Sequence, residues 1–151
     1  MTDTTPGPIV LWLSSRYENI ELANAALAHV CRRRGIDAEM EHWIGMALRE
    51  AVANAVKHGN RLDPDKRVLV KFDGAGSELT IVVGDEGGGF DPERVSDPLA
   101  PENQMKTSGR GIFYIRTFMD DVAFSRGESG GTVLTMRKDL NKRGNAKGEN
   151  A

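Results

Sequence analysis

Residues 49–60 read REAVANAVKHGN and place two different stripes on one predicted helix. Apolar residues recur with the helical period at positions 44, 47, 48, 51 and 55, so this side is expected to pack on a core. The polar stripe adjoins it and recurs at intervals of four, three and one residue: Glu50, Asn54, Lys57 and His58. A solvated helix face explains such a stripe without any function. Asn54 argues for more, because asparagine disfavours helix interiors and its neutral oxygen can ligate Mg²⁺ beside phosphates.

Composition indicates one globular domain with a sizeable core. The chain has 151 residues, 39% of them hydrophobic and 28% charged, and a formal net charge of -2 that favours neither nucleic acid nor an anionic membrane. The one basic run, Arg32-Arg33-Arg34, falls near a predicted helix end, where cations are expected; a partner-binding patch is the alternative. With no targeting segment and no apolar run long enough to span a membrane, we expect a soluble cytoplasmic protein. A single cysteine, Cys31, excludes an internal disulfide and is expected to be a buried structural thiol.

The hydrophobic period changes along the chain and sets the order of elements. A helix is predicted over 20–34, where Gly35 stops it, and the opening stretch ends a second helix that Asp37 caps and Gly59 stops. Strands are predicted at 8–15, 66–73, 78–85, 121–125 and 131–138, with a third helix over 111–119. This order predicts an α/β (α+β) two-layer sandwich, whose mixed, mostly antiparallel sheet is covered by helices on one face. We expect residues 8–140 to form the domain, and residues 1–7 and 141–151 to be disordered.

Two glycine-bearing motifs bound a long segment without a clean period, from Glu86 to about Thr107. VVGDEGGGFDP places Asp85 at a strand end before three glycines; it could accept a hydrogen bond from an exocyclic amine, or belong to a plain turn. KTSGRGIFYI brings Gly-x-Gly to a helix start, where free N–H groups can bind an anion, or where the helix simply begins. A loop this long between the two motifs is expected to close over a ligand as a lid.

Several classes of protein are excluded. The sequence has no G-x-x-x-x-G-K-[ST] motif, and neither a His-Arg-Asp nor an Asp-Phe-Gly signature, so it is neither a P-loop protein nor a eukaryotic-type protein kinase. One cysteine and three scattered histidines (His29, His42 and His58) form no zinc pattern. LWLSS lacks the glycines of a nucleophile elbow, which argues against a serine hydrolase.

Taken in order, the three motifs resemble the ATP-binding signature of the GHKL superfamily, which includes histidine-kinase catalytic domains, gyrase-type ATPases and anti-sigma factor serine kinases. The boxes stand here as Glu50-x-x-x-Asn54, Asp85-x-Gly87-x-Gly89 and Gly109-x-Gly111, and the resemblance covers roughly residues 8–140. LREAVANAVKHGN and GRGIFYIRTFMDDV are most similar to the anti-sigma factor serine/threonine kinases, which are similarly short. The lid sequence DPERVSDPLAPENQMK matches only loosely.

The resemblance implies a histidine kinase-like ATPase fold and a role for each box. Asn54 would ligate a Mg²⁺ ion that bridges the phosphates of ATP, and Glu50 would be the general base toward a partner's serine. Asp85 would recognise the adenine amine, supported by Thr132. Further ATP contacts are implied at Lys57, His58, Gly87, Gly89, Phe90, Lys106, Thr107, Ser108, Gly109, Arg110, Gly111 and Ile112. Lys57 and His58 have an alternative role as cations that cap the helix end.

The resemblance also implies a function: an ATP-dependent serine/threonine protein kinase that acts as an anti-sigma factor. It would bind a sigma factor and phosphorylate an anti-anti-sigma antagonist, without contacting nucleic acid or a membrane directly. Relatives are often homodimers. Two alternatives stay open, a regulatory module that binds ATP without phosphotransfer, and an ATPase or histidine-kinase-like fragment.

Overall fold

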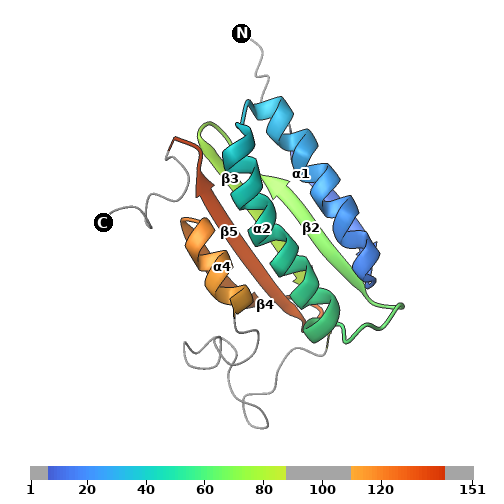
Figure 1. Cartoon of the computed structure of the whole chain (residues 1–151). Helices are drawn as coiled ribbons and strands as arrows, with labels where there is room; N and C mark the ends of the chain where they lie inside the picture. Colours follow the sequence, from blue (N-terminus) through green and yellow to red (C-terminus); the bar gives the residue numbers. More distant parts are fainter. Residues whose placement is uncertain (1–6, 88–109, 142–151) are drawn as a thin grey trace.

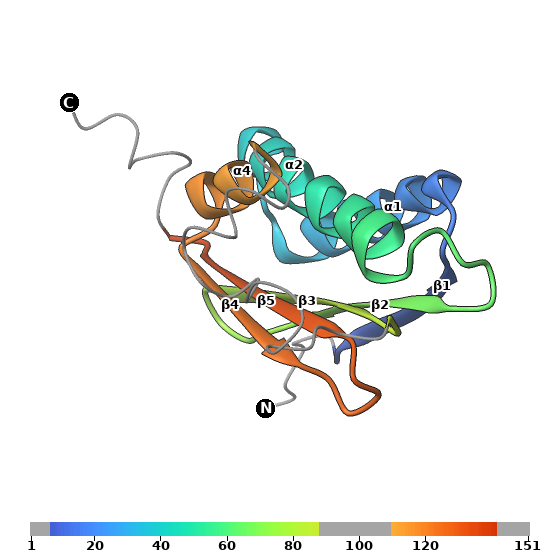
Figure 2. The same ribbon diagram turned by 90° about the horizontal axis from the view of Figure 1, so that it is seen from below.

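The computed structural model describes residues 7–87 and 110–141, which form two layers (Figures 1 and 2). One layer is a five-stranded sheet in the order β1-β2-β3-β5-β4, and all four ladders within the described residues are antiparallel. The strands are β1 (Ile9–Ser14), β2 (Arg67–Asp73), β3 (Glu78–Asp85), β4 (Asp121–Arg126) and β5 (Thr132–Asp139). The other layer holds α1 (Ile20–Arg34), α2 (Ala38–Asn54) and α4 (Arg110–Phe118), together on one face of the sheet. The predicted two-layer sandwich with helices on one face is therefore confirmed.

The predicted end of α1 and the predicted N-cap of α2 are both confirmed. Gly35 has φ 68°, the left-handed conformation that suits glycine, and its N–H donates to the carbonyl of Cys31, which ends α1. The Asp37 carboxylate accepts a hydrogen bond of 2.8 Å from the N–H of Met40 and so caps α2. A short 3-10 helix, η1 (Tyr17–Asn19), precedes α1 and was not predicted. None of the described helices has both the length and the apolar character needed to cross a membrane.

α2 is the centre of the helix layer and lies between α1 and α4 (Figure 1). Its apolar stripe is fully buried at Ile44 and Leu48, and faces the inward side chains of the sheet, such as Val70 and Ile81. Cys31 is also buried, and this burial raises the pKa of its thiol to about 12, as expected of a structural cysteine. Because the apolar side chains of α2 and those of the sheet that face them are both buried, α2 is fixed against the sheet.

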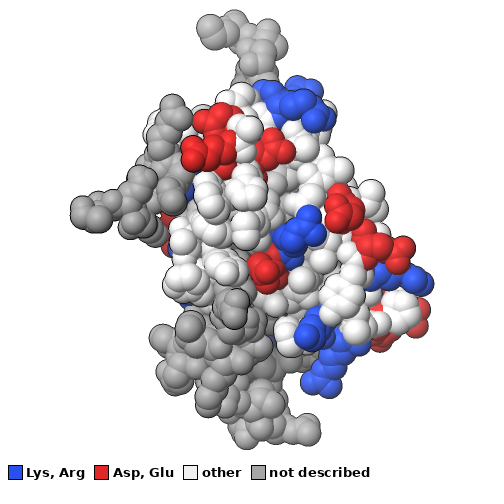
Figure 3. All heavy atoms as spheres, in the orientation of Figure 1, with Lys and Arg blue, Asp and Glu red and all other residues white. Residues whose placement is uncertain are grey.

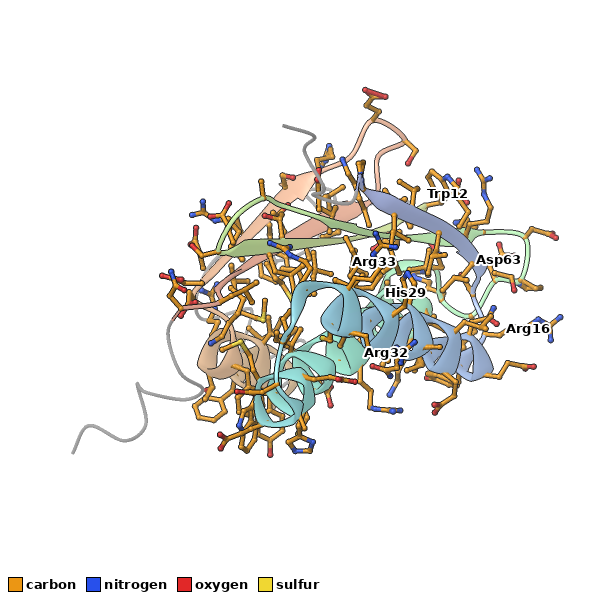
Figure 4. All side chains as sticks on the ribbon, turned by 90° about the horizontal axis from the view of Figure 1, so that it is seen from above. Trp12, Arg16, His29, Arg32, Arg33 and Asp63 are labelled. Carbon is orange, nitrogen blue, oxygen red and sulfur yellow. The ribbon has the colours of Figure 1, made fainter. Side chains whose placement is uncertain are left out.

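The three arginines at the end of α1, residues 32–34, point in different directions (Figure 4). Arg34 donates hydrogen bonds of 2.9 and 2.8 Å to the carbonyl oxygens of Gly76 and Glu78, which ties α1 to the β2–β3 hairpin. Figure 4 shows Arg33 on the side of α1 that faces the sheet, whereas Arg32 points away from it. On the helix-covered face, acidic and basic side chains form several separate groups and neither sign dominates (Figure 3), in keeping with the small net charge.

Lys138 is a buried cation that the sequence pattern did not single out. Strand alternation points it inward beside Met136, where it is 2% exposed. Its ammonium donates to the carbonyl oxygen of Phe118 at 3.1 Å, at the end of α4, and lies 3.9 Å from the carboxylate of Asp120. A cation at this place stabilises the carbonyl end of the helix, so Lys138 joins α4 to β5.

We expect Lys138→Met to lower the free energy of unfolding by roughly 2 kcal/mol, because it leaves a buried carbonyl and a carboxylate without their charged donor. Chemical denaturation measures the change. Arg137→Met is the matched control, since Arg137 is exposed on the opposite face of the same strand and pairs with Glu78 and Asp121 at the surface. It should leave the midpoint nearly unchanged; an equal loss in both variants would contradict the role given to Lys138.

Candidate functional site

The candidate site lies where the end of α2, the end of β3 and the start of β5 converge. The Asp85 carboxylate is its centre, because backbone from both neighbouring segments approaches it. The first residues of α4 lie at the same end of the molecule (Figure 1). Three motifs that are far apart in the sequence are therefore carried to one end of the sandwich.

α2 does not remain an α-helix up to its stop. It ends at Asn54, and the backbone widens into a π-helical turn, η2 (Ala55–Gly59), closed by a 2.8 Å hydrogen bond from the N–H of Asn60 to the carbonyl oxygen of Ala55. The predicted end at Gly59 is correct, but the prediction of a regular helix through Lys57 and His58 is wrong. The reason is tertiary: the wider turn accompanies the close approach of Gly59 to Asp85 and the buried contacts of Asn60. Such turns concentrate at functional sites.

The two carboxylate oxygens of Asp85 differ in their hydrogen bonds to the described residues. Its Oδ1 accepts hydrogen bonds from the N–H of Gly87 at 3.0 Å and from the N–H of Thr132 at 3.1 Å. Among the described residues nothing donates to its Oδ2. Burial raises the pKa of Asp85 above its ordinary value, although the two backbone donors and the charge of Lys66 act in the opposite direction. The group is a partly desolvated acceptor held in one orientation.

Glycine is required at three positions around this carboxylate. A Cβ on Gly59 would lie 2.1 Å from Asp85 Oδ2, and a Cβ on Gly131 would lie 2.0 Å from the Asp85 carbonyl oxygen. A Cβ on Gly87 would lie 1.9 Å from the carbonyl oxygen of Gly59. Sequence reasoning selected Gly87 for the site but took Gly59 only as a helix stop and Gly131 only as part of a turn. The signal was present in both motifs, since each glycine stands at the border of a predicted element.

Asn60 is the second residue that sequence reasoning missed. It is 1% exposed, and its amide Nδ2 donates to Ser15 Oγ at 2.6 Å and to the carbonyl oxygen of Arg67 at 2.9 Å. Its Oδ1 accepts a hydrogen bond of 2.8 Å from the N–H of Glu86. The residue thereby joins the end of α2 to three strand ends. An asparagine after a helix-ending glycine reads as an ordinary turn residue, so no sequence pattern marks it.

The polar stripe of α2 separates into two parts. Glu50 and Asn54 are half-buried one helical turn apart, and no described residue forms a hydrogen bond or ion pair with either side chain. Lys57 and His58 are exposed on the π-helical turn. Burial, and then the charge of Lys57, lower the pKa of His58, so the imidazole is neutral near pH 7. Glu50 and Asn54, rather than Lys57 and the neutral His58, are therefore the part of the stripe that combines burial with side chains that no described residue engages.

The donor set allows a hard cation only together with ligand oxygens. The described residues contain no group of three or more histidines, cysteines or carboxylates that could hold a metal. A single amide oxygen from Asn54, completed by phosphates and water, is a set that Mg²⁺ accepts, because this ion keeps several non-protein ligands. The residues present therefore fit Mg²⁺ as part of a phosphate complex.

Only the end of the third motif, from residue 110 onward, lies within the described residues. Gly89, Phe90, Lys106, Thr107, Ser108 and Gly109 lie outside the described residues. Arg110 and Gly111 begin α4. The side chain of Ile112 is 6% exposed and belongs to the core, so a ligand could reach this residue only through its backbone N–H, one of those left free at a helix start.

Comparison with known sequences places the whole sandwich in one group. A family model described as the histidine kinase-like ATPase domain matches residues 13–138. A serine-protein kinase RsbW of Listeria innocua is 29% identical over 141 residues, covering 89% of this chain and 88% of that protein. The protein of the same name from Bacillus subtilis is 30% identical over 130 residues and covers 82% and 80%. An anti-sigma F factor of Clostridium perfringens is 33% identical over 100 residues and covers 65% and 71%.

Comparison with solved structures supports the fold. The RsbU and RsbW domains of a Mycobacterium tuberculosis protein match with a TM-score of 0.65 and 20% identity, covering 89% of this chain and 32% of that one. The catalytic domain of the histidine kinase ThkA matches with a TM-score of 0.54 and 13% identity, covering 87% and 97%.

We expect Gly59→Ala to lower the free energy of unfolding by about 2 kcal/mol, because the new Cβ forces the end of α2 away from Asp85. Gly45→Ala, within α2, is the control: its Cβ would meet Leu27 and Asn24 at ordinary distances of 3.7 and 3.8 Å. It should raise stability by up to about 1 kcal/mol, since alanine favours helix. Urea denaturation compares the two, and equal stability of both variants would contradict the close approach at Gly59.

Proposed function

We infer the function from one premise, that the chain belongs to the histidine kinase-like ATPase domain family. We propose that it is an ATP-dependent serine/threonine protein kinase that acts as an anti-sigma factor. It binds a sigma factor and phosphorylates an anti-anti-sigma antagonist on serine or threonine. The names of its relatives, serine-protein kinase and anti-sigma F factor, support this class. The observation that carries the proposal is a pair of half-buried side chains on α2, Glu50 and Asn54, with which no described residue forms a hydrogen bond or ion pair.

The adenine end of ATP fits Asp85. Its free Oδ2 is an acceptor for the exocyclic amine of adenine, while Oδ1 is already held by the two backbone donors. Because the carboxylate is partly desolvated, a hydrogen bond to it is stronger than at the surface. We therefore assign base recognition to Asp85, with Thr132 and Gly87 as its supports.

The phosphate end fits the polar stripe of α2. Asn54 would hold Mg²⁺, which when bound neutralises phosphate charge. Glu50 is one turn earlier, where its carboxylate can accept the proton of an incoming serine hydroxyl. The serine oxygen then forms a bond to the γ-phosphorus as the bond to the β,γ-bridging oxygen breaks and ADP leaves. Phosphoryl transfer depends mainly on positioning and charge neutralisation, so a site with one base and one metal is sufficient. Lys57, His58 and the residues from Lys106 to Ile112 would complete the phosphate contacts.

We further propose that the protein works in the cytoplasm as a homodimer. The outer face of the sheet supports an interface, because Val10 and Trp12 on the edge strand β1 are 50% and 52% exposed. Figure 4 shows Trp12 on the side of the sheet away from the helices, and the Arg67 guanidinium lies 4.6 Å from its ring centre. Exposed apolar side chains on an edge strand are typical of protein contacts.

Replacement of the proposed base tests the kinase. Glu50→Gln should retain Mg-ATP binding but lower phosphate transfer to the antagonist at least about 100-fold, because no base accepts the serine proton. Radiolabelled transfer and calorimetric ATP binding measure the two effects. Glu39→Gln, an exposed carboxylate in the first turn of α2, is the control and should transfer at the normal rate.

Two results would contradict the proposal. Transfer by Glu50→Gln at the normal rate would remove Glu50 from the mechanism. ATP binding by the unaltered protein with no transfer to any cognate antagonist would favour a binding module without phosphotransfer.

Replacement of Asp85 by asparagine should separate stability from ATP binding. Because burial raises the pKa of Asp85, the folded state binds this proton more tightly than the unfolded state, and ionisation of Asp85 weakens folding as pH rises through its folded pKa. Asp85→Asn should therefore keep or raise the melting temperature at pH 7, yet weaken ATP binding about 10- to 100-fold. In the unaltered protein, ATP affinity should fall on acidification with a midpoint above the ordinary aspartate value of 3.8. A midpoint at or below that value, or normal ATP affinity in Asp85→Asn, would contradict the assignment of Asp85.

A further inference from the structure

We propose that Asn60 is a positioning residue for base recognition, which sets the orientation of Asp85 and so the preference for adenine over guanine. The inference rests on the proposed function, since it takes Asp85 as the group that recognises the base. Asn60 itself touches no ligand. Its effect is transmitted through the backbone of the two residues beside it in space, Gly59 and Glu86.

The amide of Asn60 has two halves with different partners. The donor half, Nδ2, is bound to the scaffold at Ser15 Oγ and the Arg67 carbonyl oxygen. The acceptor half, Oδ1, holds the N–H of Glu86, which belongs to the peptide unit directly after Asp85. One buried side chain therefore fixes the plane of the Asp85–Glu86 peptide relative to the starts and ends of three strands. Displacement of this peptide would move the backbone that carries the Asp85 side chain.

Asn60 also holds the segment that faces Oδ2 of the Asp85 carboxylate. Asn60 follows Gly59, whose Cα faces Asp85 Oδ2, and its own N–H closes the π-helical turn on Ala55. One residue thus holds η2 and the end of β3 so close together that a Cβ on Gly59 would overlap Asp85 Oδ2.

The side chain of Glu86 also holds the backbone that follows Asp85, through contacts with Arg67. Its carboxylate accepts hydrogen bonds of 2.6 Å from the Arg67 N–H and 2.9 Å from the Arg67 guanidinium, and this partner lowers the pKa of Glu86. These contacts are exposed, whereas the Asn60 side chain is 1% exposed and its hydrogen bonds are buried (to Ser15) or partly buried (to Arg67 and Glu86). We call the contacts of Asn60 and Glu86 with this backbone the clamp; Asn60 is the part of it that water replaces less readily.

The affinities for ATP and GTP should depend on the orientation of the Asp85 carboxylate, because adenine and guanine differ at the group that faces it. Adenine presents an amine donor where guanine presents a carbonyl acceptor, and a fixed carboxylate accepts only from the first. A carboxylate that can turn away loses part of its contact with ATP and part of its repulsion of GTP. The ratio of the dissociation constants for ATP and GTP therefore reports how firmly Asn60 and Glu86 hold the Asp85 carboxylate in its orientation. A general loss of stability, measured well below the melting temperature, leaves that ratio unchanged.

The test compares Asn60→Ala with Ser15→Ala in the full chain. Ser15→Ala removes one partner of the donor half but keeps the contact to Glu86, so it is a matched control for lost buried hydrogen bonds. Calorimetric titration with Mg-ATP and Mg-GTP is done well below both melting temperatures. We expect Asn60→Ala to narrow the ATP-over-GTP preference about tenfold, mainly by weaker ATP binding, and Ser15→Ala to leave it unchanged. Phosphate transfer at saturating ATP should change little in either variant.

Three results overturn the inference: a normal ATP-over-GTP ratio in Asn60→Ala, an equal narrowing in Ser15→Ala, or a loss seen only in the transfer step at saturating ATP. A measurement on the unaltered protein covers the case in which Asn60→Ala does not fold. The Glu86 amide should already exchange slowly without nucleotide, because the clamp is present beforehand; fast exchange that slows only on ATP binding overturns the inference. Failure of the unaltered protein to prefer ATP is a different result, which rejects the proposed function and this inference with it.

Discussion

The close approach of the α2 end to the Asp85 carboxylate is the constraint on which the site depends. Gly59 and Gly87 meet with no room for a Cβ on either, and Gly131 closes the third side. Such an approach costs backbone entropy and desolvates a charge, so it must be supported by contacts elsewhere. The support comes from Asn60 and from the two N–H donors to Asp85 Oδ1. Without glycine at these positions, the three segments would have to separate, and the carboxylate would become an ordinary strand-end aspartate.

α2 connects this constraint to the rest of the fold. Its apolar stripe is buried without remaining exposure at Ile44 and Leu48, between the sheet and the two other helices. A helix packed in this way cannot rotate without opening the core. Glu50 and Asn54 are on the same rigid helix, so their positions relative to Asp85 are set by core packing and not by a surface loop. Rigid elements hold functional groups more precisely than loops do.

The sequence predicted the parts of this structure that depend on local rules. α1 begins and ends where the apolar period and Gly35 place it, and Asp37 caps α2, because capping and periodicity act within one or two turns. The strands follow from alternation and from the two glycine-bearing turns. The π-helical turn, Asn60 and Lys138 were missed for one shared reason. Asn60 depends on Ser15 and Glu86, 45 and 26 residues away, and Lys138 on Phe118, 20 residues away. The turn accompanies the approach of Gly59 to Asp85, which is also distant in the sequence. A pattern within a short window carries no information on such pairs.

The polar groups of the site that no described residue engages suggest, on the proposed function, how the site would select its ligand. Glu50, Asn54 and the Oδ2 of Asp85 are half-buried groups to which no described residue donates or accepts a hydrogen bond. Each costs folding free energy that a fully solvated or fully paired group would not. In the proposed complex, a ligand with an amine for Asp85 and phosphate-bound Mg²⁺ for Asn54 would remove these costs, and binding would stabilise the folded state by mass action. A ligand with an acceptor in place of the amine would leave the half-buried Asp85 carboxylate facing another acceptor, and would bind more weakly for that reason. The contacts that make the site costly to fold are therefore the ones that give it selectivity.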